Sequence, residues 1–340
     1  MNLFRRRPKS DPDAPDRGPS ESISLELEWV AATNGHKPLV DEHVFLLGRP
    51  PLRQYLSFVT DLAIAGAVAS EGELADEWRA ASDVIARREI DEAGIADDPV
   101  FQPLPEHLIP LKERFEANDI YRRGFDMVPT EILMVELDRM VVYQKHINLE
   151  FTQQLRARLG VKPADEEVFN TCLPLEGSQQ PPLKWMRTGG GTYVFVSPSN
   201  DIRYLGSMQL KPENIVNYPV PGNMAMAIGL AVGFGSNFLN AIHCENRLVL
   251  NNGSHRAFAM REMGFTHVPC IVQHVGSREE LKAVASSDLR RHPDLYLRGP
   301  RPSMMKDYFD PELRKVVPCQ RRLRQVKLRY SSDESDLPAV

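Results

Sequence analysis

The sequence predicts a mixed α/β protein, with a mostly helical first half followed by a domain in which β-strands alternate with α-helices. Residues 73–94 are rich in good helix formers and carry apolar side chains at helical spacing. Residues 192–196 and 202–210 are runs of β-branched and aromatic residues with a turn between them. Residues 247–273 have the pattern of a strand, a turn, a helix and a second strand.

Length and composition are those of an ordinary globular protein. The chain has 340 residues, of which 42% are hydrophobic and 26% charged, which suggests two domains or one domain with extensions. A formal net charge of −5 argues against a surface that binds nucleic acid everywhere, but allows a local basic patch. The four cysteines are far apart in sequence, so we expect reduced thiols and neither disulfides nor a zinc site.

No targeting or membrane segment is expected. The N-terminal decapeptide MNLFRRRPKS is basic, but no apolar run follows it, as a secretory signal requires. The most apolar windows, 62–68 and 224–232, are far shorter than the ~20 residues that span a bilayer. We therefore expect a cytoplasmic protein without membrane contact, and the Arg- and Ala-rich composition is typical of bacteria.

The first half is predicted to begin with a disordered arm over 1–22, because this stretch of Pro, Asp, Arg and Ser contains almost nothing to bury. The region 23–165 is predicted to be acidic and mainly helical. One helix is expected over 73–94 and a second over 130–160, each ending near a glycine.

The second half is predicted to hold a domain over 166–276, a basic helical extension over 277–330 and an acidic disordered tail over 331–340. Its expected strands lie at 192–196, 202–210, 247–250 and 267–275. Its expected helices lie at 223–232, 254–263 and 277–286.

One short turn carries the chemistry that the sequence predicts. Gly253 lets the backbone turn sharply after a strand, and the helix that begins at Ser254 leaves its first N–H groups unpaired. Helix N-termini carry partial positive charge and bind anions. His255 adds a titratable donor and Arg256 a planar fork suited to phosphate oxygens. With Asn252, these residues predict a nucleotide- or phosphate-binding site; a simple helix cap with surface His and Arg side chains is the alternative.

The string N-G-x-H-R-A at 252–257, followed by a helix, a glycine and a V-P-x-x-V strand, resembles the ParB/sulfiredoxin-like superfamily. The segment 205–221 is similar to the strand and entry turn that open such domains, so the resemblance covers about 185–275. It implies a mixed sheet with helices, in which a helix N-terminus holds the phosphates of a nucleotide. It also implies ATP or CTP with Mg²⁺ as the cofactor, and makes ATP-dependent phosphotransfer the nearest reaction.

The sequence departs from each catalytic member of that superfamily. Ser254 stands where sulfiredoxins have a nucleophilic cysteine, and the turn has no acid like the glutamate of partition ParB proteins. Asn252 replaces the aspartate of the free-serine kinases and cannot act as a general base. Glu213 and His255 remain as catalytic candidates, and the pattern favours binding over catalysis.

Three further amides are candidates for a secondary pocket: Asn237, Asn240 and Asn251 could hydrogen-bond a neutral polar ligand. A tight turn into the next strand is the alternative for this segment. His146 and Glu150 are spaced to share a metal ion, but without an evident third ligand we expect a surface pair and no metal site.

Two charged regions suggest a second function. Residues 71–140 hold 18 Asp/Glu against 8 Lys/Arg, a net charge of −10, and residues 278–329 hold 14 Lys/Arg against 7 Asp/Glu, a net charge of +7. The simplest interpretation is that these two surfaces face solvent or pack against each other. Alternatively, either surface could bind a protein partner, and the basic surface could bind a nucleic acid. A non-catalytic interaction or regulatory protein is therefore the alternative. A nuclease ranks third, because no carboxylates cluster for metal binding.

Overall fold

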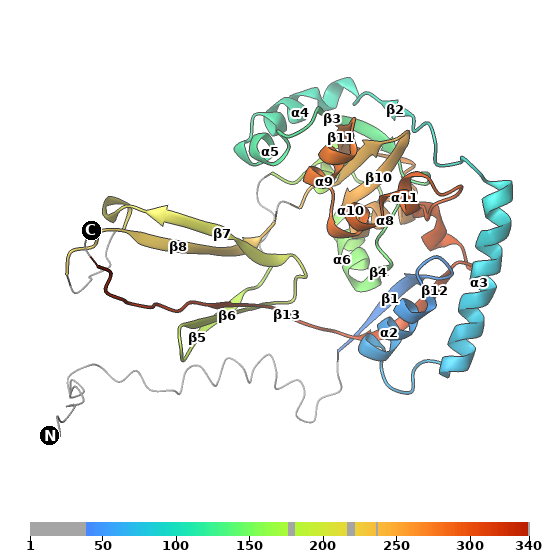
Figure 1. Ribbon diagram of the computed structural model, residues 1–340. Coiled ribbons are helices and arrows are strands. Elements are labelled where there is room, and N and C mark those ends of the chain that lie inside the picture. Colours follow the sequence, from blue (N-terminus) through green and yellow to red (C-terminus); the bar gives the residue numbers. More distant parts are fainter. Residues whose placement is uncertain (1–38, 176–180, 216–221, 236, 339–340) are drawn as a thin grey trace. The chain divides into compact units, whose positions relative to one another are not determined.

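The computed structural model describes residues 39–175, 181–215, 222–235 and 237–338, and the predicted arm over 1–22 lies outside these ranges. Contacts divide the described residues into a larger unit, 39–175 with 205–322, and a smaller unit, 181–204 with 323–338 (Figure 1). Both helices and several β-sheets are present, so the prediction of a mixed α/β protein is confirmed.

The larger unit is built on a five-stranded sheet with the order β10-β9-β11-β3-β2. Its strands are β2 (Phe101–Gln102), β3 (Thr130–Glu136), β9 (Asn240–Cys244), β10 (Arg247–Asn252) and β11 (His267–Val275). β11 pairs parallel with β9 and antiparallel with β3, and nearly all of its residues are buried. β9 and β10 form a hairpin whose turn residues, Glu245 and Asn246, both have positive φ, as a type I′ turn requires.

A second sheet, with the order β12-β1-β4, is antiparallel throughout. It consists of β1 (Val40–Leu46), β4 (His146–Asn148) and β12 (Arg314–Gln320), and is accompanied by α2 (Leu52–Leu62) and α3 (Glu71–Asp91). Phe45, Tyr55, Ile85 and Val317 belong to the apolar cluster that joins these strands and helices.

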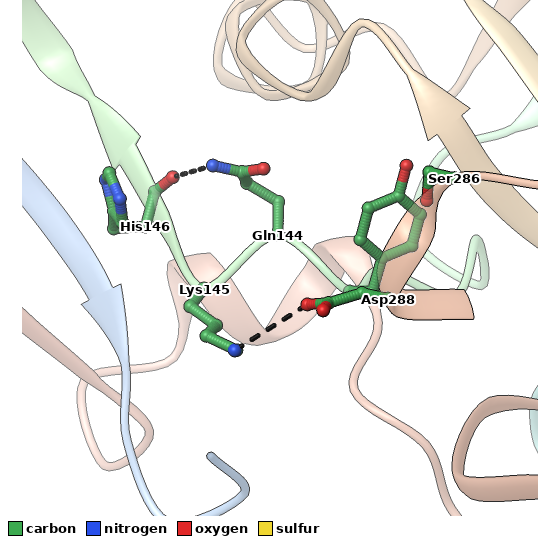
Figure 2. Close-up of a pocket in the computed structure, with 6 residues that line it drawn as sticks. Gln144, Lys145, His146, Ser286 and Asp288 are labelled. Atoms are coloured by element: carbon green, nitrogen blue, oxygen red, sulfur yellow. Dashed lines mark hydrogen bonds and ion pairs between the residues drawn. The ribbon is translucent and has the colours of Figure 1, made fainter. Parts of the chain in front are cut away.

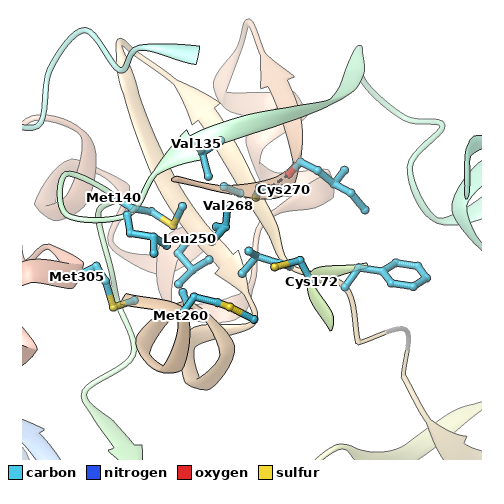
Figure 3. Packing of buried hydrophobic residues seen from close by; sticks show 14 of the residues in the cluster. Val135, Met140, Cys172, Leu250, Met260, Val268, Cys270 and Met305 are labelled. Atoms are coloured by element: carbon cyan, nitrogen blue, oxygen red, sulfur yellow. Dashed lines mark hydrogen bonds between the residues drawn. The ribbon is translucent and has the colours of Figure 1, made fainter. Parts of the chain in front are cut away.

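The main core gathers residues from both faces of the five-stranded sheet and from the helices beside it. Figure 3 shows Val135 of β3, Leu250 of β10 and Val268 of β11 near Met260 and Met305. The remaining helices of the larger unit are η2 (Glu106–Leu108), α4 (Ile109–Glu116), α5 (Asp119–Gly124), α6 (Leu149–Leu159), α7 (Asp165–Cys172), η3 (Pro212–Asn214), α8 (Ser254–Glu262), α9 (Arg278–Val284), α10 (Ser287–Arg291), α11 (Pro293–Leu297) and η4 (Met305–Phe309).

The smaller unit contains an antiparallel sheet with the order β13-β6-β5. These strands are β5 (Lys184–Thr188), β6 (Thr192–Ser197) and β13 (Arg324–Arg329). β7 (Ile202–Leu210) and β8 (Ala227–Phe234) form a separate two-stranded sheet, of which residues 205–234 belong to the larger unit.

Several predicted elements are confirmed. The helix expected over 73–94 is α3, which begins with a capping box between Ser70 and Glu73. The four expected strands correspond to β6, β7, β10 and β11, and the helices expected over 254–263 and 277–286 correspond to α8 and α9.

Other predictions are wrong. The helix expected over 130–160 is instead β3, then β4, then α6, which does end at Gly160. The helix expected over 223–232 is largely β8, and the extension expected to be helical over 277–330 ends in β12 and β13. In each case pairing with another strand overrides a local preference for helix.

The predicted boundary at 165 does not separate the two units. β3 comes from the supposedly helical first half, yet it pairs along its full length with β11 from the second half. The two halves of the sequence therefore share one sheet.

Candidate functional site

The turn between β10 and α8 has the geometry that the sequence predicts. Gly253 has φ +94°, and a Cβ at this position would lie 2.7 Å from Cδ1 of Leu239, so only glycine fits without a shift. The third and fourth N–H groups after the turn donate to the carbonyl of Gly253. Within the described part of the chain, the N–H groups of Ser254 and His255 have no such partner. Two backbone donors thus stand at the positive end of the helix.

Arg256 does not present the exposed fork that the sequence predicts. Its side chain is buried, and Nη1 donates to the carbonyl oxygen of Cys172, 3.3 Å away, at the C-terminal end of α7. A cation at a helix C-terminus is favourable, so Arg256 stabilises the packing of α7. Burial raises the pKa of the Cys172 thiol to about 12, against the opposing effect of the Arg256 charge.

The predicted amides bond mainly to one another and to the backbone. Asn251 donates to Oδ1 of Asn240 at 3.0 Å, and Asn240 and Asn252 both donate to the carbonyl of Phe238, at 3.1 and 3.2 Å. Asn237 is exposed, and its side chain takes part in none of these hydrogen bonds. The network fixes the end of β10 against β9, a structural role that the sequence prediction did not assign.

Asn251 also joins the turn to a pocket. Its carbonyl accepts a hydrogen bond from the Tyr143 hydroxyl, and its Oδ1 accepts one from the backbone N–H of Ser286 at 3.2 Å. Both of these residues line a pocket of about 290 Å³ (Figure 2). The full lining is Tyr143, Gln144, Lys145, His146, Ser286 and Asp288.

The pocket carries one charge of each sign. Nζ of Lys145 lies 3.6 Å from Oδ2 of Asp288, and Gln144 donates to the carbonyl of His146 at 3.1 Å, as Figure 2 shows. Burial raises the pKa of Tyr143, opposed by a hydrogen bond with Ser286. The lining therefore offers a cation, a carboxylate and a protonated phenol to a ligand.

Three histidines from different elements lie together beside this pocket. Nδ1 of His43 on β1 lies 3.1 Å from Nδ1 of His146 on β4. The ring of Phe58 lies 4.8 Å from that of His146, and the ring of Phe151 lies 5.4 Å from that of His255. This aromatic surrounding is poorly suited to charged imidazoles, so the cluster favours neutral rings.

The pKa values reflect that environment. Burial, and then the charge of His43, lower the pKa of His146 to about 3, with smaller contributions from His255 and Lys145. Burial, His43 and Arg256 lower the pKa of His255 to about 4. His255 is therefore a neutral group at pH 7, and His146 belongs to this cluster and not to the surface pair expected with Glu150.

Glu213 contacts none of these residues within the described ranges. It lies in η3 with an exposed side chain, and its Oε1 is 3.8 Å from Nζ of Lys211 in the same turn. The carboxylate that the structure brings to the pocket is Asp288, which the sequence prediction missed. Residues 143–146 form a polar run between apolar residues, and this pattern could have predicted that they line a pocket.

The described residues contain no group of three His, Cys, Asp or Glu side chains able to hold a metal ion. No helix in the same ranges is both long and apolar enough to cross a membrane.

Comparison of the chain with protein-family models, curated proteins and solved structures found no match.

Proposed function

We propose that the chain binds a phosphate-bearing ligand, with a nucleotide as the leading candidate, at the start of α8. The observation that carries this proposal is the hydrogen bonding of Asn251, two residues before Gly253, to two residues of the pocket lining. A phosphate on the N–H groups of Ser254 and His255 would leave the neighbouring pocket for the rest of the ligand. The resemblance to the ParB/sulfiredoxin-like superfamily predicts the same ligand class.

In this proposal the backbone supplies most of the recognition of phosphate. The guanidinium of Arg256 is buried against α7, so it would not hydrogen-bond the phosphate directly. Its positive charge would attract the ligand through space. Lys145 is the cation in the pocket lining. A Mg²⁺ ion would be held by the ligand's own phosphates, since the lining offers one carboxylate, Asp288, which the reaction below uses as a base.

Phosphotransfer is the reaction that this site would support. Asp288 replaces Glu213 as the candidate to accept a proton from an acceptor hydroxyl, because it lines the pocket and Glu213 contacts none of the lining. The neutral imidazole of His255 is a second candidate base.

The alternative, an interaction protein that docks partners through 71–140 or 278–329, has less support. These two regions pair with each other within the larger unit: Arg301 with Glu92 at 3.0 Å and Lys315 with Glu77 at 2.5 Å. Part of each charged surface is therefore already used inside the chain.

The test is nucleotide and phosphate binding by matched variants of Ser254. Arg256→Ala is a poor probe, because removing a buried side chain that supports α7 would disturb the fold. Ser254→Asp adds a charge that suits a helix N-terminus and repels phosphate, so it should keep the fold and weaken binding at least about tenfold. Ser254→Ala keeps the backbone donors and should bind like the wild type.

Binding is measured by thermal shift and calorimetry with ATP, ADP, CTP, GTP and inorganic phosphate, with and without Mg²⁺. A ligand at about 100 times its Kd should add about 2.7 kcal/mol to the free energy of unfolding. Absence of a shift with every ligand would overturn the proposal, as would unchanged affinity in Ser254→Asp.

A further inference from the structure

Four basic side chains converge on a second pocket of the larger unit. The pocket has a volume of about 350 Å³ and is formed by α9, α10, α11 and the residue that follows α11. It shares no lining residue with the pocket beside Asn251. Its full lining is Arg278, Leu281, Lys282, Arg290, Pro293, Asp294 and Arg298. Four cations and one carboxylate thus line a space of small-molecule size.

Two of these cations are held in place by carboxylates. Arg278 donates from Nη2 to Oδ1 of Asp294 at 2.7 Å, and Arg298 donates from Nε to Oε2 of Glu245 at 2.9 Å. Glu245, in the turn between β9 and β10, also pairs with Nε of Arg278. The two guanidinium groups are therefore positioned without a ligand, which lowers the entropy cost of binding one.

The other two cations, Lys282 and Arg290, lie outside these ion pairs. Within the described ranges, their side chains make no hydrogen bond or ion pair. Arg278 also has an unmet donor, because its Nη1 is buried and has no hydrogen-bond partner among the described residues. Buried polar groups in native proteins are nearly always hydrogen-bonded. An anionic acceptor in the pocket that these three residues line would supply the missing partner.

We propose that this pocket binds a small phosphate monoester. Four cations against two carboxylates, Asp294 and Glu245, leave a net charge of +2, opposite to the charge of about −2 on a phosphate monoester near pH 7. The fork of an arginine suits bidentate hydrogen bonds to phosphate oxygens. Leu281 and Pro293 add apolar surface for the carbon part of the ligand. The site is separate from the one proposed at the start of α8.

The grouping of the cations favours a phosphate over a dicarboxylate. Lys282 lies one helical turn after Arg278 on α9, so the two project from one face of that helix. Arg290 and Arg298 reach the same pocket from the segments that follow. A phosphate concentrates its charge on one group, whereas succinate separates its two charges at opposite ends. Succinate should therefore bind at least about tenfold more weakly than a phosphate monoester.

The test is calorimetric titration of the full chain with glycerol 3-phosphate, in the Ser254→Asp background. That background weakens the site proposed at the start of α8, so the remaining binding, with a Kd of about 1 mM or tighter, reports on this pocket. Adding Lys282→Gln and Arg290→Gln should weaken it at least about tenfold, because two charge-assisted hydrogen bonds are lost. Both side chains are exposed, so the fold should be kept, which circular dichroism checks.

The matched control is Arg53→Gln with Arg87→Gln, which removes two exposed charges from α2 and α3 and should leave the affinity unchanged. Absence of binding in the Ser254→Asp background overturns the proposal, as does an affinity that survives the loss of Lys282 and Arg290. An equal loss in the control would reduce the effect to net charge and also overturn it. Equal binding of succinate would overturn the assignment to a phosphate. Nucleotide binding should respond to Ser254→Asp and not to the changes at Lys282 and Arg290, so the two proposals fail independently.

Discussion

Acidification should destabilise the larger unit through the histidines beside the start of α8. Burial is the main cause that lowers the pKa of His146 to about 3 and of His255 to about 4, from an ordinary value of 6.5. The charge of His43 is the next cause for both groups. Folding therefore holds these imidazoles neutral in a pH range in which the unfolded chain protonates them.

The sign and the size of the effect follow from proton linkage. Each histidine makes its full contribution above about pH 6.5, and that contribution is lost as the pH falls from there toward the folded pKa. At about 1.4 kcal/mol per pH unit, lowering the pH from ~7.5 to ~5 should cost about 2 kcal/mol for each group. His146 and His255 together should then cost about 4 kcal/mol of unfolding free energy.

The assay is urea unfolding of the full chain across this pH range. The double variant His146→Gln/His255→Gln should lose about 4 kcal/mol of the wild type's pH dependence, whereas a variant of the exposed His292 should keep it all. Carboxylates elsewhere contribute the same pH dependence to the wild type and to the variants, so their contribution cancels in the comparison. A double variant with the wild type's full pH dependence would refute the neutral histidine cluster.

Two further predictions concern packing within the larger unit, and each has its own comparison variant. Gly253→Ala should lower the unfolding free energy by about 2–4 kcal/mol, because it combines φ +94° with a Cβ 2.7 Å from Leu239. Gly264→Ala has φ +92° but open space around its Cβ, so it should cost only about 1–2 kcal/mol, and equal losses would contradict the steric account. Arg301→Met should cost about 3–5 kcal/mol, because Arg301 is buried and holds both carboxylate oxygens of Asp307, at 2.6 and 2.7 Å. In thermal unfolding, Arg301→Met/Asp307→Leu should recover most of that loss, and a double variant as unstable as the single one would show that the pair itself is needed.

The part of the fold that could be predicted is the part whose signals are local. α3 has its capping box within four residues, and α8 lies between two glycines, Gly253 and Gly264, that both adopt positive φ. The strand, turn and helix at 247–262 were therefore readable from neighbouring residues alone.

The part that could not be predicted depends on distant pairing. β3 contains good helix formers, yet it becomes a strand because its seven residues pair with β11, more than a hundred residues later. The pocket has the same origin, since Tyr143 and Ser286 are far apart in the sequence and both bond to Asn251. No spacing within the sequence reports such a contact.

Arg256 lies at the predicted place in the chain, but its side chain has a different role from the one predicted. The sequence places an arginine where the first turn of α8 begins, and the structure confirms that position, but its side chain points toward the end of α7. A surface arginine there would bind phosphate directly, whereas the buried Arg256 bonds to the end of α7, so in the proposed site the phosphate would be held by the backbone N–H groups. Backbone donors recognise charge and shape, not a base, so any preference for one nucleotide must come from the pocket beyond Asn251. Substituting Lys145 or Ser286 should therefore change the ranking of nucleotides, while Ser254→Asp should weaken all of them alike.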